Sequence, residues 1–162
     1  MEMEHSKKSH HQAPGNNHYK KLLLMTVLSF IAMYLLMYSM VDIFSNVIPN
    51  VNQFYMAGLM TMPMVIIELA IMGGMYKKKK LNLAIFVASS ILLVCFFFGI
   101  RQQAAIGDKQ FLKSMIPHHA AAILMAGKAN IKDPEIKKIT EQNITNQKAE
   151  IKKIKAKLKE MK

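Results

Sequence analysis

Soft donor side chains are the chemically distinctive feature of this sequence. Methionine accounts for 15 of the 162 residues, and there are six histidines but only one cysteine. Thioethers are uncharged ligands that need no deprotonation, so they bind copper(I) or silver(I) well in a low-dielectric medium and bind hard ions poorly. The residue types therefore favour a soft, monovalent metal ion, and the spacing of the methionines has to support that hypothesis.

Most methionines lie in two apolar stretches at helical spacing. In the second stretch, a methionine or a glutamate recurs every four positions: Met56, Met60, Met64, Glu68 and Met72. In the first, Met33, Met37 and Met40 lie one turn apart on a shared helix face. Glu68 is the only ionisable residue of its stretch, and an acid within a membrane is costly and by default functional. Either this stripe binds a cation, or the methionines fill irregular helix contacts while Glu68 hydrogen-bonds as a neutral acid.

A second motif combines methionine with histidine in the C-terminal part of the chain. Met115 lies three residues before His118 and four before His119, so either imidazole can meet the thioether one helical turn away. Met125 lies two turns beyond His118 on the same face. Soft sulfur together with imidazole is suited to copper(I), whereas the alternative is a pair of structural histidines.

Three apolar stretches must position the first set of residues. They cover residues 22–41, 54–76 and 81–100, and each has about the 20 residues needed to cross a hydrocarbon core. The first stretch runs on to Asp42 without a small-residue cleavage site, so we interpret it as a retained anchor rather than a signal peptide. The sequence therefore predicts a three-helix transmembrane region over residues 22–100.

Lysine placement predicts the orientation. Lys77 to Lys80 form a basic block between the second and third stretches, whereas the first connection, residues 42–53, has no Lys or Arg. The positive-inside rule puts that block in the cytoplasm, so we expect a bacterial inner-membrane protein with a cytoplasmic N-terminus. Residues 101–162 then form a periplasmic or otherwise extracytoplasmic domain. This segment is itself basic, but segments of about 60 residues translocate largely regardless of charge.

The remaining segments are a polar tail and a helical hairpin. Residues 1–21 are expected to be a disordered tail, which either captures metal loosely or is simply polar; its donors are Met1, Met3, His5, His10, His11 and His18. Residues 101–162 predict two helices, at about 108–129 and 134–160, and Asp133-Pro134-Glu135 marks the second start. A lone hairpin buries little apolar area, so we expect a homo-oligomer to complete it. The fold class is all-α.

The hairpin segment resembles the domain of unknown function 305 family, a ferritin-like family often associated with copper handling in bacteria. The resemblance is carried by Asp108, Phe111, Met115-Ile116-Pro117-His118-His119, Ala122-Ile123 and Met125-Ala126, followed by Gln147 and Glu150. It implies that Met115, His118, His119 and Met125 are candidate metal ligands. Asp108, Gln147 and Glu150 would then be outer ligands or orienting groups, and Asp42, at the end of the first span, is a further candidate. The apolar half resembles membrane-anchored members of the same family.

The sequence thus leads to a membrane-anchored copper(I)-binding protein for sequestration, transfer or tolerance, with silver(I) as a surrogate and other copper-handling proteins as partners. The alternative is a methionine-rich oligomeric scaffold without metal. A di-metal oxidase is less well supported, because its paired Glu-x-x-His units are missing from the outer segment. A net charge of +12 does not indicate nucleic-acid binding, since no aromatic-interleaved basic motif accompanies it.

Overall fold

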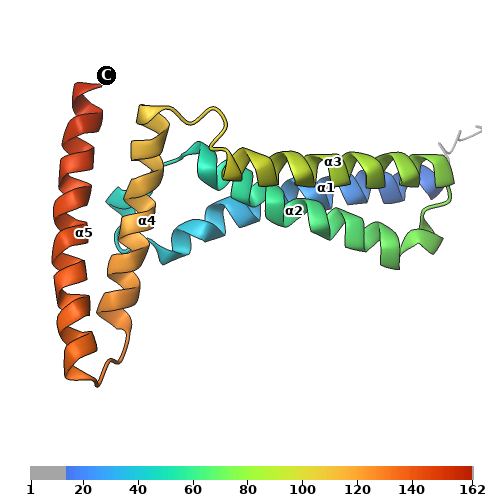
Figure 1. Cartoon of the computed structure of the whole chain (residues 1–162). Helices are drawn as coiled ribbons and strands as arrows, with labels where there is room; N and C mark the ends of the chain where they lie inside the picture. The colour runs from blue at the N-terminus through green and yellow to red at the C-terminus, as the bar shows by residue number, and fades with distance from the viewer. Residues whose placement is uncertain (1–13, 162) are drawn as a thin grey trace, which may run out of the picture.

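The protein is described by a computed structural model that covers residues 14–161 (Figure 1). All regular structure in this part of the chain is helical, as predicted. The five α-helices are α1 (Pro14–Leu36), α2 (Val51–Ile71), α3 (Lys79–Arg101), α4 (Asp108–Lys128) and α5 (Pro134–Glu160). Three short 3-10 helices join them: η1 (Met37–Met40), η2 (Phe44–Asn46) and η3 (Gly73–Met75). The all-α prediction is confirmed.

Three helices are long and apolar enough to cross a membrane, covering Asn17–Met40, Val51–Ile71 and Lys79–Arg101. They run side by side as one bundle in which α2 packs against both α1 and α3 (Figure 1). Only 6% of the first span and 11% of the third are buried inside the protein. Because exposed apolar surface of this extent is unfavourable in water, the three-span prediction and membrane association agree with the structure.

Close packing of α2 on α3 depends on a glycine. A Cβ atom at Gly58 would lie 2.4 Å from the ring of Phe96, so any larger residue would have to displace that ring. The same ring lies 6.1 Å from Phe54, whose centroid is 5.1 Å from Phe30 of α1. This row of aromatic rings therefore connects all three spans.

The first helix begins earlier than expected. Residues 14–21 were predicted to belong to a disordered tail, but α1 starts at Pro14, and proline suits the first turn of a helix. Tertiary contacts hold this start, because the Tyr19 hydroxyl donates to Asn82 Oδ1 at 2.6 Å and its ring packs against Tyr76. His18 also contacts the Tyr76 ring edge-on. The expected metal donors at positions 1, 3, 5, 10 and 11 lie outside the described residues.

Helices α4 and α5 form the predicted antiparallel hairpin, which lies across one end of the bundle with α4 between the bundle and α5 (Figure 1). We call this the hairpin end. The hairpin core consists of Ile116, Ala120, Ile123 and Ile151, and Val41 and Ile48 from the first connection pack against it. Asp133 caps α5 by accepting two backbone N–H groups of the first turn. The first connection thereby fixes α4 onto the bundle.

Candidate metal-binding cavity

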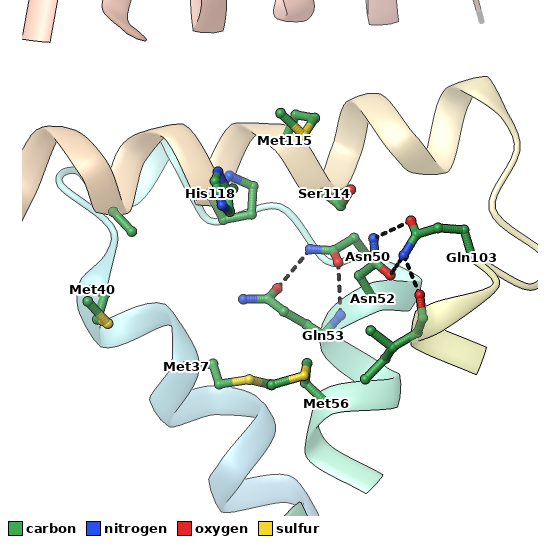
Figure 2. Close-up of a pocket in the computed structure, with 13 residues that line it drawn as sticks. Met37, Met40, Asn50, Asn52, Gln53, Met56, Gln103, Ser114, Met115 and His118 are labelled. Carbon is green, nitrogen blue, oxygen red and sulfur yellow. Dashed lines mark hydrogen bonds between the residues drawn. The ribbon is translucent and has the colours of Figure 1, made fainter. Parts of the chain in front are cut away.

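A cavity of about 430 Å³ lies at the hairpin end, where the spans meet α4 (Figure 2). Five of its lining residues carry soft or imidazole donors: Met37, Met40, Met56, Met115 and His118. We call it the Met/His cavity. All five were candidate metal ligands in the sequence, although the methionines of the spans and the Met-His motif were expected to form separate sites.

Three segments far apart in the sequence supply these donors. Met37 and Met40 lie on η1, at the end of the first span, and Met56 lies near the start of α2. Met115 and His118 come from one turn of α4, which covers this end of the bundle. Figure 2 shows the side chains of Met37 and Met56 extending toward one another across the cavity. The antiparallel arrangement of the first two spans therefore brings the thioethers together.

One wall of the cavity is made of side-chain amides. The Asn50 Oδ1 atom caps α2 by accepting the backbone N–H of Gln53, and the Asn50 amide nitrogen donates to Gln53 Oε1 at 2.8 Å. Asn52 and Gln103 exchange a pair of hydrogen bonds at 3.2 Å, which ties the second span to the chain after the third. Because these amides hydrogen-bond to one another, they line the cavity without contacting the methionine sulfur atoms as hydrogen-bond donors. Sequence analysis missed this wall, although Asn50, Asn52 and Gln53 cluster at the end of a connection without Lys or Arg.

His118 and His119 point to different neighbours. His118 is exposed at the cavity and makes no hydrogen bond within residues 14–161, so its ring nitrogens are available to a ligand. His119 is 8% exposed, its Nδ1 atom is hydrogen-bonded to Gln147 Oε1, and its Nε2 atom lies 3.5 Å from Glu150 Oε2. Since Gln147 Oε1 can only accept, Nδ1 carries the hydrogen. His119 therefore joins α4 to α5.

Burial determines the charge state of His119. Its pKa is lowered, chiefly because desolvation penalises the imidazolium form; the Glu150 carboxylate opposes this shift, and His118 adds to it. Glu150 is half exposed, with 51% of its side chain accessible, so solvent screens its attraction for a charged ring. The lowered pKa thus favours the neutral ring, whose Nδ1–H donates to Gln147 and whose unprotonated Nε2 atom makes no hydrogen bond to Glu150.

The other candidate residues lie away from the Met/His cavity. Glu68 accepts a hydrogen bond from the Tyr76 hydroxyl at 3.1 Å, toward the opposite end of the bundle. Asp42 accepts from Asn46 and from the Ile43 backbone, and Asp108 opens α4. The remaining candidate methionines do not line the cavity: Met33, Met60, Met64, Met72 and the 53%-exposed Met125.

The donors of the cavity are four thioethers and one imidazole. Across residues 14–161, no three His, Cys, Asp or Glu side chains gather in a way that could hold a metal ion. Thioether sulfur binds copper(I) and silver(I) in preference to hard divalent ions. The chemistry that this set can perform is therefore the capture of a soft monovalent cation beside the apolar spans.

Fold and site together define a helical protein in which three helices long and apolar enough to span a membrane are followed by a hairpin. Residues 100–158 match the family described as "Domain of unknown function (DUF305)". The chain is also similar to "Uncharacterized protein L153" of Acanthamoeba polyphaga mimivirus, at 37% identity over 136 residues, which covers 80% of this chain and 86% of that protein. No solved structure matches the chain. The chain belongs to the DUF305 family, as its double-histidine motif predicted, and the similarity to the viral protein extends beyond the hairpin.

Proposed function

We propose that this protein is a membrane-anchored copper(I)-binding protein, which sequesters or transfers the ion in support of copper tolerance. The observation that carries the proposal is the convergence of Met37, Met40, Met56, Met115 and His118 on one cavity. If these positions served only to fill apolar space, aliphatic side chains would pack there equally well. The gathering of soft ligands from three separate segments therefore favours metal binding. Silver(I) is the expected surrogate ion.

In this function the span methionines and the hairpin act as one site. Met37 and Met56 would hold the ion from the side of the spans, while His118 would bind it as a neutral imidazole from α4. Met60 lies one turn deeper on α2 than Met56, so the stripe toward Glu68 would accept the ion as a store or a conduit. The hairpin core, through Ile116 and its neighbours, holds α4 over the cavity.

The proposed location is the bacterial inner membrane, with the N-terminus in the cytoplasm and the hairpin outside it. Lys20 and Lys21 lie on α1 beside Tyr19, whose hydroxyl accepts the backbone N–H of Lys78 at 3.1 Å. The two basic clusters thus share the end of the bundle opposite the hairpin, which supports the positive-inside assignment. Topology reporters fused to either end of the chain test this orientation. Phosphatase activity from the N-terminal fusion would place the N-terminus outside the cytoplasm and so contradict the proposed orientation. Homo-oligomerisation and exchange with other copper-handling proteins belong to the same proposal.

The decisive experiment titrates the detergent-purified full-length protein with copper(I) against a competing chelator. Two cavity variants, His118→Ala and the double variant Met37→Leu/Met56→Leu, are compared with the control Met25→Leu/Met62→Leu, whose residues do not line the cavity. Leucine nearly matches methionine in volume, so folding should be retained. The cavity variants should lose more than the roughly 10–100-fold in affinity that loss of an outer-shell partner costs, whereas the control should bind like the native protein.

Equal affinity in all variants would overturn the cavity assignment. Absence of copper(I) binding in the native protein would favour the oligomeric scaffold, in which case Met37→Leu/Met56→Leu would leave copper tolerance unchanged in cells. Oxygen consumption on addition of cuprous or ferrous ion would instead favour the di-metal oxidase.

A further inference from the structure

A second cavity, of about 540 Å³, lies between the first connection and α5. Four lysines line it at spacings of four, three and four residues, which places them on one face of α5: Lys148, Lys152, Lys155 and Lys159. We call it the lysine cavity. Asp42 is the only carboxylate among its lining residues. The cavity therefore carries an excess of positive charge that suits an anionic ligand.

The lining of the lysine cavity is partly apolar, and the cavity lies close in sequence to the end of the first span. Ile123 and Ile151, both buried residues of the hairpin core, form part of its lining together with Ile43. The first connection leaves the first span at Met40, and beside the cavity it presents Ile43 at 56% exposure and Phe44 at 90%. An aromatic ring left this exposed is unfavourable in water but typical of the membrane interface.

Beside the lysine cavity, a buried polar atom lacks a hydrogen-bond donor. Asn46 is 2% exposed and its amide nitrogen donates to Asp42 Oδ1 at 2.7 Å, but its Oδ1 atom has no partner within the described residues. Rotating the amide would set its oxygen against the carboxylate, so this orientation is the favourable one. A buried acceptor without a donor is costly. A ligand hydroxyl or ammonium group would relieve that cost once a shift of the Asn46 side chain opened this atom to the cavity.

We propose that the lysine cavity binds the headgroup of an anionic phospholipid. The phosphate lies against the ammonium groups of α5, and a headgroup hydroxyl such as that of phosphatidylglycerol is the donor for Asn46. Phe44 and Ile43 enter the adjacent lipid, where their apolar surface is covered. Lys155 is already directed to this side, since its Nζ atom donates to the Ser45 carbonyl at 3.0 Å. The site is independent of the Met/His cavity and anchors the hairpin to the bilayer that the spans cross.

Lipid binding is tested on the full-length protein by native mass spectrometry in detergent. Phosphatidylglycerol, phosphatidylcholine of the same chain length and inorganic phosphate are titrated separately. Phosphatidylglycerol should bind roughly tenfold more tightly than phosphatidylcholine, because basic residues near the membrane attract anionic lipids. The variant Lys152→Gln/Lys155→Gln should remove this preference. The control Lys137→Gln/Lys153→Gln changes the net charge equally on α5 but outside the cavity, so it should keep the preference.

A second measurement uses the absence of tryptophan from the chain. In Phe44→Trp the single indole should be quenched by brominated phosphatidylglycerol in vesicles, and emission typical of an aqueous indole would overturn the proposal. Equal binding of the two lipids, or equal behaviour of the two lysine variants, would also overturn it. Displacement of the lipid by an equal concentration of inorganic phosphate would assign the cavity to free phosphate instead.

Discussion

Replacing His119 by alanine separates the roles of two adjacent histidines. His119 is buried and bonded to Gln147, whereas His118 faces the Met/His cavity. We therefore expect His119→Ala to destabilise the hairpin and to leave copper(I) affinity within roughly threefold of the native value. A threefold change in affinity is less than the roughly 1.4 kcal/mol that a tenfold change represents. His118→Ala should do the reverse.

The magnitude follows from the contacts of His119. Loss of the hydrogen bond to Gln147 costs about 1 kcal/mol, and loss of most of the buried imidazole surface costs about a further 1–2 kcal/mol. The approach to Glu150 contributes close to nothing, because that carboxylate is half exposed and the lowered pKa keeps His119 neutral. The total is about 2–3 kcal/mol, or roughly a 30- to 160-fold change in an opening equilibrium.

Amide hydrogen exchange in detergent measures this change directly. Exchange in α4 and α5 should accelerate by that factor in His119→Ala, while exchange in the spans α1 to α3 should be unchanged. Gln147→Ala is the matched variant on the partner helix and should reproduce part of the effect. If His119→Ala instead abolished copper(I) binding with the hairpin still fully protected, His119 would be the ligand and the assignment of the two histidines would be wrong.

Three further predictions concern packing, capping and pH. Gly58→Ala should weaken the α2–α3 contact by about 1–3 kcal/mol, because its Cβ would meet Phe96 at 2.4 Å; Gly74→Ala, which has nothing within 4 Å, is the control in thermal unfolding. Asp133→Ala should cost about 1 kcal/mol of hairpin stability through loss of the α5 cap, measured by hydrogen exchange. Because burial lowers the pKa of His119 in the folded state, the unfolded chain binds more protons as pH falls below about 6.5. The protection of hairpin amides against hydrogen exchange should therefore decrease as the pH falls from about 6.5 to below the lowered pKa of folded His119. His119→Ala should remove this pH dependence.

Local rules were sufficient to predict most elements of the fold. Three spans follow from the length of the apolar stretches, since a bilayer core requires about 20 apolar residues, and α5 begins at Pro134 because Asp133 and the proline act locally. The start of α1 was missed for the opposite reason. Residues 14–21 have little apolar periodicity, and their helix is held by contacts of Tyr19 with Asn82 and Tyr76, which are distant in the sequence.

The kinds of donor in the candidate site were evident from the sequence, because thioether and imidazole chemistry belongs to the residue types themselves. The sequence did not indicate which donors share a cavity. Successive residues of a helix are rotated by about 100°, so one of two adjacent histidines must turn away, and the packing of Ile116 and Ile151 between α4 and α5 makes it His119. Val41 and Ile48 of the first connection pack against the same core, which holds α4 across the spans and brings Met115 and His118 to Met37 and Met56. Donor identity is a local property, whereas the site depends on long-range burial that only the tertiary structure decides.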